Sequence, residues 1–194
     1  MLETRIAGYD FGRVPRSAVS LDELHQLELA LQFTEEDRQA LRRASELISD
    51  HAEELVDGWR AIIGAHEFLS KSFFGPDGKP DERYKAAVKK RFVRWVVDLV
   101  TRPFDQAWLD YQQEIGQRHT PDKKNATEHA KTPPVVPLRY VLAFISPVSL
   151  SVRPLLQKSG VGAEEIDRME AAWTKAVVLS VTLWTAPYVK DGLW

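Results

Sequence analysis

The stretch FDQAWLDYQQEIGQRH, residues 104–119, decides the fold of this chain. Its large apolar side chains Trp108, Tyr111 and Ile115 recur at spacings of three and four residues, the period of one face of an α-helix. His119 continues the same stripe four residues later, where the pattern ends. The stretch therefore predicts an amphipathic helix whose C-terminal end carries an imidazole on its apolar face.

The helical period recurs along the rest of the chain, and no run alternates polar and apolar residues as a strand would. Thr34 and Asp37 have the spacing of an acidic capping box, which predicts a helix starting there. Pro147 and Pro187 lack the N–H that a helix interior needs, so they should kink or end their helices. We predict an all-α single domain of eight or nine helices, built on the segments 21–31, 34–50, 51–65, 81–101, 104–119, 138–156 and 163–189.

Two segments lack this period. Residues 1–20 combine glycine, proline and aromatic residues, and we expect an extended arm. Residues 120–136 are rich in threonine, lysine and proline, and we expect a loop. Its length is unusual for a compact domain, which indicates a functional or mobile segment.

Composition excludes several classes of site and partner. The 194 residues include 26 basic and 28 acidic side chains, so no strong field attracts nucleic acid or an anionic membrane. The start of the chain does not resemble a signal peptide, and the longest uncharged stretch near the C-terminus, 176–189, is shorter than the roughly 20 residues of a membrane span. We therefore expect a cytoplasmic protein that binds neither nucleic acid nor membranes.

The chain has no cysteine, which excludes disulfides, thiolate zinc sites, iron–sulfur clusters and covalently attached haem. Its five histidines do not form the HExxH spacing of a zinc helix, and the glycine-rich phosphate and nucleophile motifs are absent. His119 is the candidate that remains. A lone histidine on an apolar face is usually a satisfied core or boundary residue, but it is also what a haem iron requires.

Several segments of the sequence resemble the protoglobins, single-domain haem proteins related to the sensor domains of globin-coupled sensors. The resemblance runs from about residue 6 to residue 190. The longest matching motif is DQAWLDYQQEIGQRH. The segments that carry the resemblance are GYDFGR (8–13), KKRFVRWVVD (89–98), FDQAWLDYQQEIGQRH (104–119), KKN (123–125), LRYVLAFISP (138–147) and LWTAPYVK (183–190).

The resemblance implies a globin-like fold with an extra N-terminal helix, here 21–31, in a domain that spans 21–194. It implies that the arm, 1–20, covers a noncovalent haem b, and that two copies form a homodimer through the last two long helices. It also implies that His119 in the EIG-x-RH motif is the proximal iron ligand. The distal and pocket residues that it implies are Trp59, Phe73, Val88, Phe92, Phe144 and Val148, and we add Tyr111 on the face of His119. Each of these would equally suit an aromatic or apolar core stripe.

Two arginines carry open alternatives. The family usually has tyrosine after the distal tryptophan, where this chain has Arg60. Arg60 would either turn outward to Asp57 or a haem propionate, or point inward and favour negative charge on a bound ligand. Arg91 would either pair with a propionate or lie on a solvated helix face.

The resemblance implies reversible binding of dioxygen, carbon monoxide or nitric oxide at five-coordinate iron, in a gas carrier or sensor. A sensor would require a separate signalling or redox partner. One alternative is a haem enzyme with nitric-oxide dioxygenase, nitrite, peroxide or carbene-transfer chemistry, although Val88 supplies no distal acid or base for peroxide cleavage. A second alternative is a helical interaction module that has lost haem.

Overall fold

A computed structural model of the protein describes residues 6–190 and 192–194, so Met1–Arg5 of the predicted arm lie outside the described residues. The described part contains helices and no β-strand, and one isolated bridge joins Phe74 and Pro80. The helices are α1 (Leu21–Ala30), α2 (Glu35–Asp50), α3 (Ala52–Ala65), α4 (Glu67–Ser70), η1 (Lys71–Phe73), α5 (Glu82–Thr101), α6 (Gln106–Gln117), α7 (Leu138–Ala143), α8 (Ile145–Leu150), α9 (Arg153–Leu156), η2 (Gln157–Ser159), α10 (Ala163–Thr185) and η3 (Ala186–Tyr188).

Local chemistry fixes where the main helices begin. The N–H of Thr34 donates to Asp37 Oδ2 at 2.8 Å, which confirms the predicted capping box of α2. Asp81 accepts from an N–H of the first turn of α5, and Asp105 does the same for α6. Each carboxylate satisfies a backbone donor that has no partner within the helix. The caps at Asp81 and Asp105 fix the N-terminal ends of α5 and α6, the two helices that flank the site.

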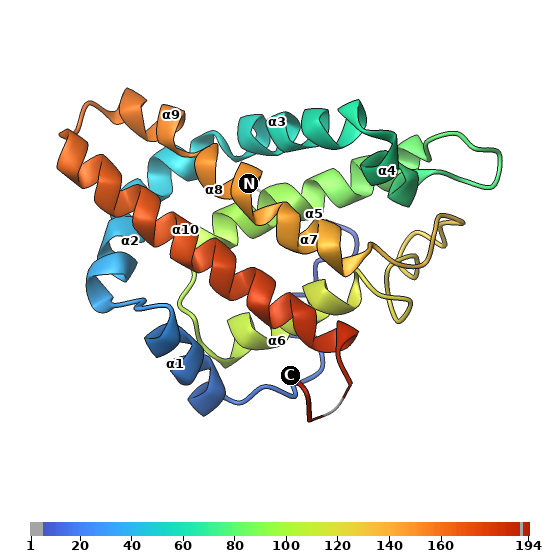
Figure 1. The fold of residues 1–194 in the computed structure, drawn as a ribbon, viewed down its shortest axis with the longest axis horizontal. Helices are drawn as coiled ribbons and strands as arrows, with labels where there is room; N and C mark the ends of the chain where they lie inside the picture. The colour runs from blue at the N-terminus through green and yellow to red at the C-terminus, as the bar shows by residue number, and fades with distance from the viewer. Residues whose placement is uncertain (1–5, 191) are drawn as a thin grey trace.

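Helix α10 is the centre of the fold and runs diagonally across the view in Figure 1. It packs on α2, α6 and α8, while α5 packs on α2 and α3. The largest buried side chains where these helices meet are Trp59, Trp108 and Trp173. Helix α1 precedes this bundle, where the resemblance implies an extra N-terminal helix.

Gly116 allows the closest helix contact near the C-terminal end of α6. A Cβ added there would lie 3.0 Å from both Cα and O of Trp184 on α10, and 3.2 Å from Cδ of Pro187. A larger residue would therefore force the two helices apart. The glycine of the EIG-x-RH motif has a packing role that periodicity alone does not show.

The long apolar segment over 138–156 is divided into α7, α8 and α9, which confirms the interruption predicted at Pro147 and adds a second break that was not predicted. The chain turns at Phe144 and at Ser151–Val152. Pro147 cannot donate to the carbonyl of Ala143, and Pro154 cannot donate to that of Leu150. Each missing hydrogen bond lies beside one of the breaks. The prediction considered Pro147 and did not consider Pro154.

One segment, Leu138–Ser159, is long and apolar enough to cross a membrane by length and composition, and 33 % of its most apolar window is buried. The inward side chains of this segment, among them Val141 and Val148, line an internal cavity. Core helices pass the same test of length and composition.

Gly116→Ala should lower the free energy of unfolding by about 1–3 kcal/mol, because the added methyl group meets the backbone of Trp184. The control is Gly58→Ala in α3, where an added Cβ meets nothing within 4 Å. This control should be neutral or stabilising by up to about 1 kcal/mol through helix propensity. Urea denaturation of the two variants measures the difference, and equal stability would contradict the assigned contact.

Candidate functional site

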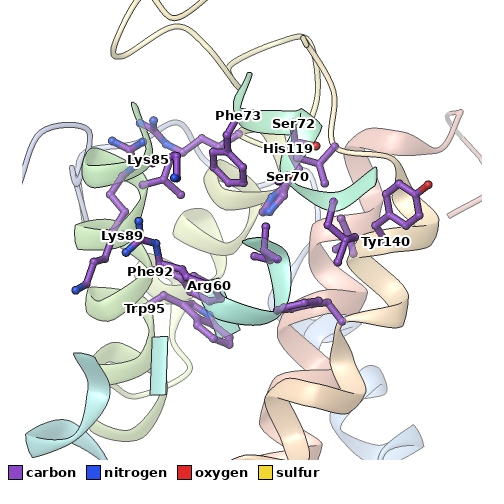
Figure 2. Close-up of a pocket in the computed structure, with 18 of the residues that line it drawn as sticks. Arg60, Ser70, Ser72, Phe73, Lys85, Lys89, Phe92, Trp95, His119 and Tyr140 are labelled. Carbon is purple, nitrogen blue, oxygen red and sulfur yellow. The ribbon is translucent and has the colours of Figure 1, made fainter. Parts of the chain in front are cut away.

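A cavity of about 620 Å³ lies between α3, α4, α5, the end of α6, the α7–α8 segment and α10. Its volume is within the range of about 300–1,000 Å³ typical of small-molecule sites. Most of its wall is apolar. Figure 2 shows Phe73, Phe92, Trp95 and His119 around it. The predicted site residues that line it are Arg60, Phe73, Val88, Arg91, Phe92, Tyr111, His119, Phe144 and Val148.

Trp59 was predicted to face the cofactor, but it is not among the residues that line the cavity. Its indole Nε1 donates to Ser151 Oγ at 2.8 Å, and only 1 % of its surface is exposed. Its ring centroid lies 5.1 Å from that of Phe92. Trp59 therefore supports Phe92 from behind.

His119 lies just beyond α6, whose last residue is Gln117, and not on the helix itself as predicted. Its Nδ1 is 2.8 Å from the carbonyl oxygen of Ile115. A carbonyl can only accept, so Nδ1 carries the proton and Nε2 of the neutral ring keeps its lone pair. Nε2 makes no hydrogen bond to any residue that the structure describes.

Packing and burial fix this ring in its neutral form. The imidazole stacks on the indole of Trp184, with centroids 5.5 Å apart and planes 20° apart. Burial lowers the pKa of His119 below its usual 6.5, and the nearby Lys124 charge lowers it further. The hydrogen bond to the Ile115 carbonyl raises the pKa, but burial has the larger effect. His119 thus presents a neutral imidazole nitrogen to an apolar cavity.

The backbone of His119 is held as firmly as its ring. Its carbonyl oxygen accepts the N–H of Val136 at 2.9 Å and the hydroxyl of Tyr188 at 3.2 Å. The single proton of that hydroxyl is shared with the carbonyl of Val136, the closer of the two acceptors at 2.7 Å. The predicted loop over 120–136 therefore begins and ends beside the backbone of His119.

The two arginines with open alternatives both take protein partners. Arg60 contacts Asp57 Oδ1 at 3.3 Å, the outward alternative, while the residue still lines the cavity. Arg91 pairs with Glu128 at 2.6 Å and donates to the carbonyl of Ala7 at 2.9 Å. The Arg91 side chain is only 11 % exposed, so the solvated helix face proposed as one alternative was wrong.

The arm lies one layer outside the cavity. Tyr9 contacts the ring of Tyr111 edge-on at 5.2 Å, and Phe11 approaches the same ring at 5.5 Å. The hydroxyl of Tyr9 donates to Asp98 on α5 at 2.6 Å. The described part of the arm therefore packs behind Tyr111 and Arg91, which themselves form the cavity wall.

Sequence reasoning missed Lys124, which lines the cavity and is only 3 % exposed. Its Nζ donates to the carbonyl of Ser72 at 2.8 Å and to Thr132 Oγ1 at 2.9 Å. Burial lowers its pKa to about 8. The KKN segment drew attention only as part of a resemblance, because a lysine in a polar loop is normally solvated.

The described residues hold no group of three or more His, Asp or Glu side chains that would chelate a bare metal ion. The site instead offers one neutral imidazole at the edge of a large apolar cavity. A model of the protoglobin family matches residues 20–194. The chain belongs to the protoglobin family. The other histidines lie outside the cavity wall of this protoglobin.

A solved structure supports the same fold. The globin domain of the Geobacter sulfurreducens globin-coupled sensor matches with a TM-score of 0.65 and 18 % sequence identity. The match covers 86 % of this protoglobin and 97 % of that domain. No curated protein sequence matches the chain.

Membership of this family implies a haem cofactor, and the residues present fit it. A haem of the globin type is held by one neutral imidazole nitrogen and packs against apolar walls. His119 offers the nitrogen with its tautomer set by Ile115, while Phe73 and Phe92 are among the aromatic wall residues. A backbone carbonyl on the second nitrogen is the usual support for a metal-binding histidine.

The stability of the apoprotein should fall as the pH falls below 6.5. His119 has a lowered pKa in the folded state, so the unfolded chain takes up its proton first. The folded state then loses up to about 1.4 kcal/mol per pH unit, down to the folded pKa. His119→Gln removes this contribution, so the stability difference between wild type and variant should shrink from about pH 7.5 to pH 5.

Urea denaturation of the apoprotein across this range measures the effect. His129→Gln, at an exposed side chain of the 120–136 loop, is the matched control for losing a histidine. A pH-independent difference between wild type and His119→Gln would contradict the burial of the ring in its neutral form.

Proposed function

We propose that this protoglobin reversibly binds dioxygen, carbon monoxide or nitric oxide at a five-coordinate, His119-ligated haem b, as a gas carrier or sensor. The observation that carries the proposal is the free Nε2 of a buried, neutral imidazole facing an apolar cavity. A haem held by His119 would supply iron that can coordinate a diatomic ligand. The absence of cysteine supports a noncovalent haem.

The chain itself performs three tasks in this proposal. His119 holds the cofactor, and the Ile115 carbonyl keeps its other nitrogen protonated and its ring oriented. Val88 and Phe92 on α5 present apolar side chains to the cavity, so these two positions supply neither an acid nor a base. Arg60 and its partner Asp57 supply charges to the cavity wall. A role in sensing would use a separate signalling or redox partner.

We also propose a homodimer through the last two long helical segments. Leu142 on α7 is 45 % exposed and Leu150 on α8 is 65 % exposed, while other residues of the same helices line the cavity. Most apolar residues of α10 are already buried within one chain. The α7–α8 segment therefore offers the apolar surface that a second copy would cover.

Haem titration tests the proposed ligand. The wild-type protein should take up haem, and its reduced Soret band should shift with carbon monoxide. His119→Ala should lose the histidine-ligated spectrum, and added imidazole should restore it, because the variant leaves space beside Trp184. His129→Ala, in the loop, is the matched control and should behave as wild type. A wild type that takes up no haem, or a His119→Ala spectrum identical to wild type, would reject the proposal.

Leu150→Glu should shift the protein from dimer to monomer, because it places a charge in the proposed contact. Leu29→Glu is the control, since Leu29 is 64 % exposed on α1, away from the α7–α8 segment. Sedimentation velocity of the holoprotein measures both. A monomeric wild type, or a dimer unaffected by Leu150→Glu, would remove this interface.

A further inference from the structure

The polar part of the cavity wall carries more basic than acidic side chains. Asp57 is the only acidic residue among the described residues that line it, against six lysines and arginines. Five of these cations pair with carboxylates of the protein. The pairs are Arg60–Asp57 at 3.3 Å, Lys85–Glu82 at 2.7 Å, Lys89–Asp57 at 2.9 Å, Arg91–Glu128 at 2.6 Å and Arg118–Glu114 at 3.0 Å.

Lys124 is the exception. Within the described part of the chain, no carboxylate lies within 4.0 Å of its Nζ. Its closest acceptors are the neutral Ser72 carbonyl and Thr132 hydroxyl, and a third, Asn125 Oδ1, is distant at 3.5 Å. The ring of Tyr84 lies 5.0 Å from the ammonium. The charge is therefore solvated by dipoles and remains uncompensated.

An uncompensated buried ammonium is costly, and proteins normally pair it. Burial lowers the pKa of Lys124 to about 8, so near neutral pH the group is still mostly charged. Two of its three donors have good acceptors, while the third makes only the long contact to Asn125. An anionic oxygen reaching Nζ would replace that long contact with a short, charge-assisted hydrogen bond.

We propose that Lys124 binds a carboxylate of the molecule that fills the cavity. Given the function proposed above, on which this assignment rests, that carboxylate is a haem propionate. The protein would thus hold the cofactor at two chemically different points, the iron through His119 and a carboxylate through Lys124. Arg91, the earlier candidate for this role, already has Glu128 as its partner.

The contacts of Lys124 give this pairing a second effect. Nζ bonds to Ser72 in η1 and to Thr132 in the loop, and the Lys124 carbonyl accepts the Tyr84 hydroxyl of α5 at 3.0 Å. Asn125 Nδ2 also donates to the carbonyl of Thr132 at 2.7 Å. A carboxylate on Nζ would therefore join the cofactor to the loop and to two helices at once.

The test compares ligands that differ only in their carboxylates. Wild type and Lys124→Met are loaded with haem or with haem dimethyl ester, and the rate of loss to an excess of a haem-scavenging apoglobin is measured. Lys124→Met should speed the loss of haem by about tenfold or more, as expected for a hydrogen bond to a charged group. Loss of the dimethyl ester should change less than about twofold, because its esters offer no anionic partner.

Lys123→Met is the matched control, because Lys123 pairs with Glu114 and does not line the cavity. Lys123→Met should leave both rates unchanged, and Lys124→Arg should retain part of the preference for haem over its ester. If Lys124→Met accelerates the loss of both ligands equally, or does not fold well enough to bind either, the lysine has a structural role and the proposal is overturned.

Metal-free protoporphyrin IX and its dimethyl ester separate this inference from the proposed function, since neither needs an iron ligand. Fluorescence titration should show that wild type prefers the free acid and that Lys124→Met loses the preference. A wild type that binds haem through His119 but shows no effect of Lys124→Met rejects only the carboxylate site. A wild type that binds neither haem nor porphyrin rejects both proposals.

Discussion

The site depends on one hydrogen bond, from Nδ1 of His119 to the carbonyl of Ile115. This contact forms because α6 ends two residues before His119: the N–H of His119 bonds to the carbonyl of Gly116 at 2.9 Å, which leaves the carbonyl of Ile115 without its i+4 backbone donor. Trp184 closes the other face of the ring, and α10 can approach this closely because residue 116 is glycine. Together, the end of α6, the glycine at position 116 and the indole of Trp184 give the imidazole one tautomer and one orientation. The rest of the cavity is arranged around that fixed nitrogen.

Most of the cations around the cavity are paired with carboxylates of the protein, but one is not. Cations such as Arg60 and Lys89 have carboxylates beside them, so they add little net field to the interior. Lys124 has none and is almost fully buried. A cavity that is apolar over most of its wall, with a neutral nitrogen and an uncompensated ammonium, favours an apolar molecule that offers a metal to the nitrogen and carries an acid group. Haem has this combination of properties.

Periodicity predicted the helical class and most of the helix positions, because it reports which side of a segment is buried. It located His119 but could not show what lies opposite the imidazole, which depends on helices distant in sequence. The proline at 147 predicted one break within 138–156, but the second break, beside Pro154, was not predicted. The resemblance, not periodicity, suggested Trp59 as a pocket residue; neither could show that its indole bonds to Ser151, 92 residues further along the chain. The sequence pattern could not identify Lys124, because this lysine is buried only when the loop folds back onto Ser72.

The closure of the 120–136 loop at its two ends has an evolutionary consequence. The N–H of Val136 donates to the carbonyl of His119, and the hydroxyl of Tyr188 contacts the carbonyls of both residues. The residues between 119 and 136 therefore form a loop whose two ends are hydrogen-bonded together. The entropic cost of closing such a loop grows only logarithmically with its length. Insertions beyond Thr132, between the residues that contact Lys124 and the return at Val136, would therefore change the outline of the protein while leaving the position of the imidazole intact. Changes of length in this segment should therefore be tolerated better than substitutions beside His119.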